Sequence, residues 1–141
     1  MMSLRNMLER DEARVPHAYP DSLGYLTIGV GHLIDKRKGG RLPDVIIDAL
    51  LDYDIAEKTA EVVKALPWFG QLNEPRKAVI VSMAFQLGTD GLLEFKTALA
   101  AMSAANYDRA AWAFLQSKVA KYQTPERWQR HARQIQTGEW Q

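Results

Sequence analysis

Residues 24–34 read GYLTIGVGHLI and differ in composition from the segments on either side. They hold strand-forming side chains separated by glycines: Tyr25, Thr27, Ile28 and Val30 with Gly24, Gly29 and Gly31. Aromatic and β-branched side chains favour extended backbone, and glycines within such a run mark turns or bulges. This pattern predicts a small antiparallel hairpin or a three-stranded meander.

Helical patterns precede and follow this stretch. Ser3 is a suitable N-cap for a first helix over residues 3–12, in which Leu4, Met7 and Leu8 share one face. Pro16 and the turn-forming residues 19–22 are expected to end that helix. Residues 35–40 are expected to form a charged loop that ends in glycine.

The rest of the chain predicts helices only. A long helix of about 35 Å is expected from Pro43 to Leu66. The next helix begins at Asn73 and ends at Gly88, and its apolar middle at residues 78–85 is typical of a central buried helix. Shorter helices are expected at residues 95–103, 108–117 and 125–135. This order predicts an α+β fold in which a small sheet is segregated from the helices.

The composition indicates one globular domain. The chain has 141 residues, of which 47% are hydrophobic and 25% charged, and it has no cysteine. Single domains of ~100–150 residues fold without a metal or a disulfide. No apolar run approaches the ~18 residues of a membrane span, and charged residues interrupt positions 1–12 where a signal peptide would be apolar. We therefore expect synthesis in the cytoplasm.

Charge is unevenly distributed along the chain. Residues 1–95 hold 11 Lys and Arg against 14 Asp and Glu, whereas residues 96–141 hold 7 against 3. The basic C-terminal third is expected either to face an anionic polymer or membrane surface or to form an ordinary solvated helical face. Because the net charge is only +1, nucleic acid is not an expected partner.

Cofactor signatures are absent from the sequence. Gly29-Val30-Gly31 lacks the third glycine of a dinucleotide loop, and no phosphate-binding loop with Gly-Lys-Ser/Thr occurs. The histidines do not fall at metal-ligand spacing. We expect neither a metal nor a cofactor.

Glu12 and Asp21 are the carboxylates best suited to chemistry. Glu12 ends the first helix, Asp21 follows nine positions later in the turn before the sheet, and Thr27 lies six positions further on. Glycoside hydrolysis uses two carboxyl groups, one that protonates the leaving oxygen and one that acts on water or on the developing cation. Paired carboxylates near a helix end are common, so the spacing alone leaves a structural role open.

The residues around these carboxylates carry a more specific signal. The segments Glu12-Ala13-Arg14, His17-Ala18-Tyr19, Asp21, Gly24-Tyr25 and Thr27-Ile28-Gly29-Val30-Gly31-His32 together resemble the phage-type lysozymes, the T-even phage muramidase family. The resemblance continues through Met83–Gly88, Tyr107–Ala111, Gln123–Arg127 and Thr137–Trp140, and so spans nearly the whole chain.

The resemblance implies a single lysozyme-like domain over residues 1–141. It implies a small antiparallel sheet lobe at about residues 13–42 and a connecting helix at about 43–66. A helical bundle lobe at about 67–141 would also include the first helix, residues 3–12.

The resemblance further implies a muramidase. Such an enzyme hydrolyses the β-1,4 bond between N-acetylmuramic acid and N-acetylglucosamine in bacterial peptidoglycan, with inversion at the anomeric carbon. Glu12 is implied as the general acid, Asp21 as the group that positions water or stabilises the transition state, and Thr27 as the holder of that water. An inverting pair of carboxyl groups stands ~6.5–9.5 Å apart to admit the water.

Other residues are implied to support this site: Arg127 paired with Glu12, His32 paired with Asp54, and Gln86 behind the cleft. Leu33 and Phe85 match positions that line the saccharide cleft, although core packing explains two apolar residues equally well. Gly29 and Gly31 are expected to let the sugar approach the backbone.

Some features depart from the family pattern. Ala13 stands where the family usually has glycine after the acid. Ala98 and Ala113 stand where polar residues contact substrate, so the subsites on the bundle side are not defined by the sequence. The loop before the long helix is also shorter. None of these changes removes a catalytic group.

The resemblance also implies a biological setting. We expect a monomeric phage or prophage endolysin, made in the host cytoplasm, that reaches the cell wall through a membrane lesion made by a holin. Residues 128–140, with two tryptophans and two arginines, are a candidate for contact with anionic membranes. The alternative is a catalytically inactive lysozyme-fold protein that binds the cell wall, and the intact set of catalytic residues argues against it.

Overall fold

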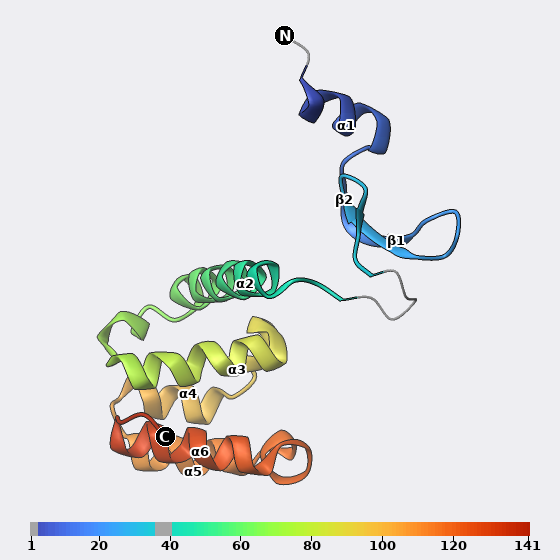
Figure 1. The fold of residues 1–141 in the computed structure, drawn as a ribbon. Coiled ribbons are helices and arrows are strands. Elements are labelled where there is room, and N and C mark those ends of the chain that lie inside the picture. The colour runs from blue at the N-terminus through green and yellow to red at the C-terminus, as the bar shows by residue number, and fades with distance from the viewer. Residues whose placement is uncertain (1–2, 36–40) are drawn as a thin grey trace. The chain divides into compact units, whose positions relative to one another are not determined.

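The computed structural model describes residues 3–35 and 41–141, and it confirms the predicted α+β, lysozyme-like class (Figure 1). The chain divides into two compact units, residues 1–50 and 51–141, each of which is described by itself. The boundary between them falls inside α2 (Asp44–Ala65), the long helix expected at residues 43–66. The predicted lobe boundaries stay predictions. Of the loop predicted at residues 35–40, the structure describes only Asp35.

The N-terminal unit holds the three-stranded meander. Helix α1 (Leu4–Glu12) precedes β1 (Val15–Pro20), β2 (Leu26–Gly29) and β3 (His32–Leu33), which pair antiparallel in the order β1-β2-β3. The expectation that Pro16 and the residues after it only end the first helix is wrong, because these residues form β1. An edge strand tolerates proline, since one side of it needs no N–H donor.

Helix α1 is short and closed at its start by reciprocal hydrogen bonds. The Ser3 hydroxyl accepts from the Asn6 N–H at 3.2 Å, and the Asn6 side-chain oxygen accepts from the Ser3 N–H at 3.1 Å. This is the capping arrangement that the N-cap prediction at Ser3 requires.

The C-terminal unit is helical, and its elements follow the order predicted from the sequence. After the last part of α2 come η1 (Phe69–Gln71), α3 (Glu74–Leu93), α4 (Lys96–Ser103), α5 (Tyr107–Leu115), η2 (Val119–Gln123) and α6 (Pro125–Thr137). Helix α5 packs against α4 and α6, and α6 also packs against α3 (Figure 1). The π-helical turn η2 was not predicted from the sequence.

Gly88 breaks α3 but does not end it. Its backbone turns left-handed, with φ 75° and ψ 158°, before the helix resumes to Leu93. The Thr89 hydroxyl donates a hydrogen bond to the Glu61 carboxylate of α2, which Lys58 also contacts at 3.2 Å. The helix end predicted at Gly88 is therefore a kink within α3. The residue that follows it, Thr89, is hydrogen-bonded to a side chain of α2.

The core of this unit is built around Trp128 of α6. Its ring is fully buried and stacks on Phe95, with centroids 5.5 Å apart, while Phe114 meets it edge-on at 6.1 Å. The middle of α3 is buried as predicted at Val79, Ile80, Met83 and Ala84. Phe85 departs from that prediction, because 44% of it is exposed.

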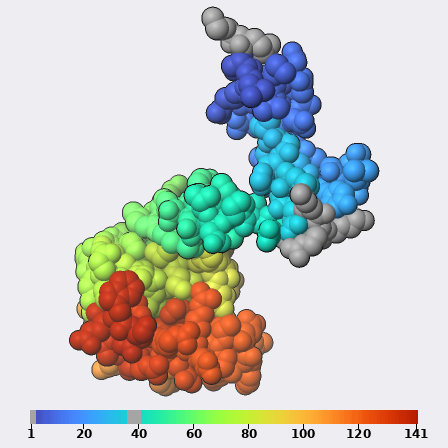
Figure 2. Space-filling model, in the orientation of Figure 1, coloured from blue at the N-terminus to red at the C-terminus, as the bar shows by residue number. Residues whose placement is uncertain are grey.

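The C-terminal end of α6 is fastened to the start of α3. The Arg76 guanidinium donates to the carbonyls of Ile135 and Gln136, at 2.8 and 3.2 Å, and stacks on the Tyr107 ring at 3.6 Å. Asn73 donates to the Gly138 carbonyl at 2.9 Å. Figure 2 shows the C-terminal segment, in red, lying against this part of the surface.

Within the described residues, no helix taken singly is both long and apolar enough to cross a membrane; α3 and α4 meet that test only as a pair bent by 103°.

Candidate functional site

Glu12 is the last residue of α1, and the helix ends there because the next residue, Ala13, has an unusual backbone conformation. Ala13 has φ 63° and ψ 166°, a region that side-chain-bearing residues rarely adopt. This is the position at which the sequence lacks the glycine usual in the family it resembles. The backbone therefore adopts a glycine-like turn after Glu12 even though alanine occupies it.

The turn between β2 and β3 receives the Glu12 side chain. Residues 29–31 connect the paired residues Ile28 and His32, and both glycines of this turn have positive φ. A Cβ on Gly31 would lie 2.9 Å from Glu12 Oε2 and 3.0 Å from its Cγ, closer than real contacts allow. The open side of Gly31 is thus filled by Glu12, not left for a sugar as expected, whereas Gly29 has no atom within 4 Å on that side.

Asp21 is fixed in the turn between β1 and β2. Its Oδ1 accepts hydrogen bonds from the N–H groups of Leu23, at 2.9 Å, and Tyr25, at 2.8 Å. Its own N–H donates to the Tyr25 carbonyl at 2.8 Å, and Gly24 supplies the positive φ that closes the turn. Among the described residues, none donates a hydrogen bond to Asp21 Oδ2, so this oxygen is the one open to a ligand.

Thr27 lies in the middle strand of the sheet. It pairs with Tyr19 on β1 and with Leu33 on β3, and only 6% of it is exposed. Its hydroxyl donates to the Tyr25 carbonyl at 3.3 Å. Asp21 and Thr27 are therefore both bonded to the backbone of Tyr25.

The three predicted catalytic residues belong to one compact unit. The Glu12 carboxyl meets the turn at one end of β2, Asp21 occupies the turn at the other end, and Thr27 stands between them on the strand. A strand advances ~3.3 Å per residue, so the two turns lie roughly 10 Å apart along β2.

Arginines near Glu12 are bonded to other carboxylates. Arg14 donates to Glu9 at 2.8 Å, and Arg10 pairs with Asp11 at 2.7 Å. The hydrogen bond from Arg14 holds the pKa of the Glu9 carboxyl below its usual value, with Arg5 contributing in the same direction. Arg14 and Arg10 are thus occupied by acids other than Glu12.

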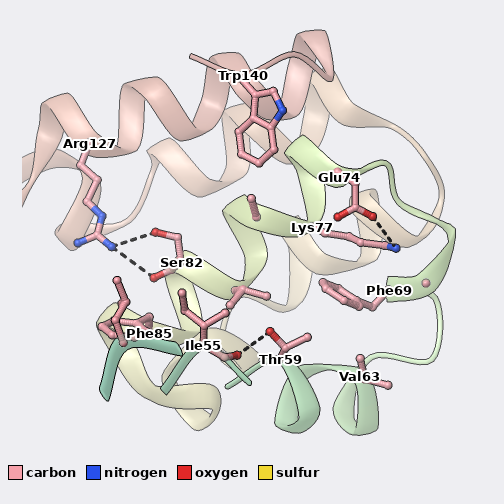
Figure 3. Close-up of a pocket in the computed structure, with 14 residues that line it drawn as sticks. Ile55, Thr59, Val63, Phe69, Glu74, Lys77, Ser82, Phe85, Arg127 and Trp140 are labelled. Carbon is pink, nitrogen blue, oxygen red and sulfur yellow. Dashed lines mark hydrogen bonds and ion pairs between the residues drawn. The ribbon is translucent and has the colours of Figure 1, made fainter. Parts of the chain in front are cut away.

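The C-terminal unit contains a cavity of about 670 Å³ that includes Phe85 and Arg127 among its lining residues (Figure 3). Its walls come from α2, η1 and α3, with Trp140 at one end, and are mostly apolar. Arg127 donates to the Ser82 hydroxyl at 2.9 Å and to the Ser82 carbonyl at 3.4 Å, as the dashed lines in Figure 3 show. Ser82 is not among the site residues predicted from the sequence.

Gln86 is held inside the same unit. Its side-chain oxygen accepts from the Trp128 indole N–H at 3.1 Å, and its amide nitrogen donates to the Thr124 hydroxyl at 3.1 Å. Gln86 thus connects α3 to the start of α6, beside the exposed Phe85.

The other predicted residues are distributed over both units. Leu33 and His32 are exposed on β3 and line a separate cavity with Arg41, while Asp54 is half-buried on α2. The pairings of Arg127 with Glu12 and of His32 with Asp54 join the two units and stay predictions. Ala98, at a predicted subsite position, is 97% buried in the core.

No three His, Asp or Glu side chains in residues 3–35 and 41–141 gather as ligands for one metal ion.

Comparison with known proteins identifies relatives along most of the chain. The family model described as "Phage lysozyme" matches residues 9–133. "Probable T4-type lysozyme 1" of Dictyostelium discoideum is 27% identical, in an alignment that covers 96% of this chain and 95% of that protein. "Probable T4-type lysozyme 2" of the same organism is 26% identical with the same coverage.

The "Pre-baseplate central spike protein Gp5" of Enterobacteria phage T4 is 30% identical over 77% of this chain, but the chain spans only 23% of that protein. These matches support a lysozyme-type function, that of a glycoside hydrolase with peptidoglycan as its substrate. Since the family model covers most of its length, this chain belongs to the phage lysozyme family.

Proposed function

We propose that this protein is an endolysin muramidase that hydrolyses the β-1,4 bond between N-acetylmuramic acid and N-acetylglucosamine. The observation that carries the proposal is the seating of the Glu12 carboxyl on Gly31, at the opposite end of β2 from Asp21, with Thr27 between them. In this proposal an acid, a second carboxylate and a hydroxyl act along one short strand. Glycoside hydrolysis uses two such carboxyl groups, and the hydroxyl can hold the attacking water.

In the proposed reaction, Glu12 donates its proton to the glycosidic oxygen as the bond to the anomeric carbon breaks. Water attacks that carbon and gives a proton to Asp21. Asp21 suits this role because Oδ1 accepts from two backbone N–H groups, which fixes the carboxylate and leaves Oδ2 to accept the proton of the water. Proton transfer by positioned groups of this kind contributes roughly 10²–10⁴-fold to rate.

Thr27 is proposed to hold the attacking water through its hydroxyl oxygen. Its hydrogen is directed to the Tyr25 carbonyl, which leaves the oxygen lone pairs for the water. The turns at the two ends of β2 are roughly 10 Å apart by strand geometry, which suits an inverting pair better than the ~5 Å of a retaining pair.

The remaining site residues are proposed to shape the cleft. Leu33 stands opposite Thr27 on β3, and Phe85 exposes an aromatic face suited to packing on a sugar ring. Arg127 is proposed to pair with Glu12, and His32 with Asp54, as structural contacts.

The biological role proposed is lysis of a bacterial host by a monomer. The enzyme would be made in the host cytoplasm and would reach the wall through a holin lesion. Contact with anionic membranes through residues 128–140 would depend on Trp140 and the exposed arginines, because Trp128 is buried in the folded protein.

Mass spectrometry of products from purified peptidoglycan tests the reaction, with Glu12→Gln as the variant. The matched control is Glu9→Gln, which removes a carboxyl from the same helix that is bonded to Arg14. Muropeptides with reducing N-acetylmuramic acid ends are expected from the wild type and from Glu9→Gln, and not from Glu12→Gln.

Two other outcomes would overturn the proposal. Products with a 1,6-anhydro ring would mean transglycosylation without water. Wall binding by a folded wild-type protein that releases no product would indicate the inactive cell-wall-binding alternative.

A further inference from the structure

A cavity of about 740 Å³ lies beside β3, between this strand and the chain that enters α2. All of its lining residues belong to the N-terminal unit, which also holds the proposed catalytic residues. Leu33 connects the cavity to these residues, because it pairs with Thr27 on the neighbouring strand. Paired residues of an antiparallel sheet have their side chains on the same face. A glycan bound along β2 would therefore pass beside this cavity.

Arg41 is the arginine that lines this cavity, and contacts within the N-terminal unit fix its place. Its N–H donates to the Ile34 carbonyl at 3.4 Å, which holds the residue beside the end of β3. Its guanidinium Nε lies 3.7 Å from a carboxylate oxygen of Asp35, whose side chain is only 9% exposed. The Arg41 side chain itself is 79% exposed. A nearly buried acid thus orients a guanidinium that faces solvent at the cavity.

The Arg41 guanidinium keeps most of its donors for a ligand. Arginine has five N–H donors in a planar fork that matches the two oxygens of a carboxylate. In the part of the chain that the structure describes, Asp35 is the one acid paired with Arg41, and 3.7 Å is too long for a hydrogen bond. With respect to the described residues, the terminal nitrogens of Arg41 are thus open to a bidentate contact with an anion.

The charge of this segment favours an anionic ligand. Residues 32–44 hold four Lys and Arg against two Asp. Of these two acids, Asp35 pairs with Arg41, and Asp44 lies in the first turn of α2, where the helix dipole compensates a negative charge. The net positive charge that results attracts an anion more strongly than a neutral or cationic group.

We propose that Arg41 is a substrate-binding residue whose guanidinium binds a carboxylate of the peptidoglycan strand. The inference rests on the proposed function, since it takes its ligand from that substrate. Two parts of the strand can supply the carboxylate: the lactyl group of N-acetylmuramic acid where no peptide is attached, and the stem peptide where one is. Arg41 holds this acid while the sugar lies along β2.

Isothermal titration calorimetry with soluble peptidoglycan fragments tests the contact without cleavage when every protein also carries Glu12→Gln. Arg41→Gln removes the charge and the fork, and Kd should rise about 10-fold, as expected for the loss of one charge-assisted contact. Arg5→Gln is the matched control, because Arg5 is also 79% exposed and its Nε lies 3.4 Å from Glu9 in the same unit. Its Kd should change less than about twofold. Equal losses in the two variants, or no binding by the protein that keeps both arginines, would overturn the proposal.

Three fragment preparations identify the group that Arg41 binds. A loss of affinity in Arg41→Gln on peptide-free fragments assigns the lactyl carboxylate, whereas a loss confined to peptide-bearing fragments assigns the stem peptide. Fragments whose carboxyl groups have been converted to amides should bind equally well with and without Arg41→Gln. A loss that persists on the amidated fragments would overturn the proposal, because the contact would not be with a carboxylate.

Steady-state kinetics separates this inference from the proposed function. In the protein that keeps Glu12, Arg41→Gln should raise KM about 10-fold and change kcat less than about twofold, because Arg41 is not one of the proposed catalytic groups. A kcat that falls while KM stays unchanged would overturn the substrate-binding role. A wild type that releases no muropeptides, although fragment binding depends on Arg41 as expected, would instead refute the proposed function.

Discussion

Glu12 occupies the space that a side chain on Gly31 would need. A Cβ at residue 31 would stand 2.9 Å from Glu12 Oε2, and this contact joins the end of α1 to the turn between β2 and β3. The glycine therefore determines where the proposed acid lies.

Gly31→Ala should disable the enzyme. The new methyl would displace the Glu12 carboxyl, and misplacement of a catalytic group by ~1 Å lowers rate on the order of 10²-fold. Gly29→Ala is the matched control, because its φ of 72° is equally unfavourable to alanine but no atom lies within 4 Å of the new methyl. Muropeptide release should fall far more in Gly31→Ala, although both variants lose ~1–2 kcal/mol of stability from backbone strain. Equal activity losses would mean that the contact with Glu12 is unimportant.

Ala13→Gly should stabilise the protein. Ala13 has φ 63° and ψ 166°, and a side-chain-bearing residue held in such a region is disfavoured by ~1–3 kcal/mol. Glycine removes that strain but gains freedom in the unfolded chain, which leaves a net gain of about 1 kcal/mol. Urea unfolding of Ala13→Gly should therefore show a higher midpoint.

Ala18→Gly provides the comparison for that experiment. Ala18 is exposed on β1 and has no positive φ, so glycine there should only destabilise, by ~0.5–1 kcal/mol. A lower midpoint in both variants would show that Ala13 is not strained.

Local sequence pattern was sufficient for the parts of the site that depend on neighbouring residues. Asp21 lies in a turn and Thr27 on a strand because prolines, glycines and β-branched residues specify those conformations within a few positions. β1 was missed because its two prolines indicate a turn unless the strand is known to be an edge.

Contacts between distant segments could not be read from the sequence. The alternating glycines of the β2–β3 turn give no indication that Glu12 fills the space at Gly31. The hydrogen bond from Arg127 to Ser82 depends on how α3 and α6 pack, and the two residues are 45 positions apart. A serine on an apolar helix carries no signal for such a contact.

Arg76→Ala should strongly destabilise the C-terminal unit. The side chain donates to two carbonyls at the end of α6 and stacks on Tyr107, so its removal leaves those carbonyls without a donor. Hydrogen bonds from charged groups contribute ~1.5–3 kcal/mol, and we expect a loss of about 2–3 kcal/mol in the free energy of unfolding. Arg109→Ala, at an exposed position, should change it by less than about 0.5 kcal/mol. Similar losses in the two variants would contradict the fastening role.

Acidification should weaken the protein through His131. The folded protein keeps the ring neutral, with its pKa lowered from 6.5 to about 4, whereas the unfolded chain binds a proton near pH 6.5. Its full contribution to stability is therefore present above pH 6.5 and declines as the pH falls from 6.5 to about 4, with no further loss below that. Because the ring is only half-buried and solvent screens it, we expect a loss of about 1–2 kcal/mol.

Comparison of the wild type with His131→Gln separates the loss of stability caused by protonation of His131 from the loss caused by protonation of carboxylates. Both proteins carry the same acids, including Glu9 and Glu61, whose lowered pKa values reduce stability as these groups protonate in acid. Between pH 7 and pH 4 the free energy of unfolding should fall by ~1–2 kcal/mol more in the wild type than in His131→Gln. His17→Gln, which removes an exposed histidine from β1, should behave like the wild type. Parallel pH curves for the wild type and His131→Gln would show that His131 is not held neutral by the fold.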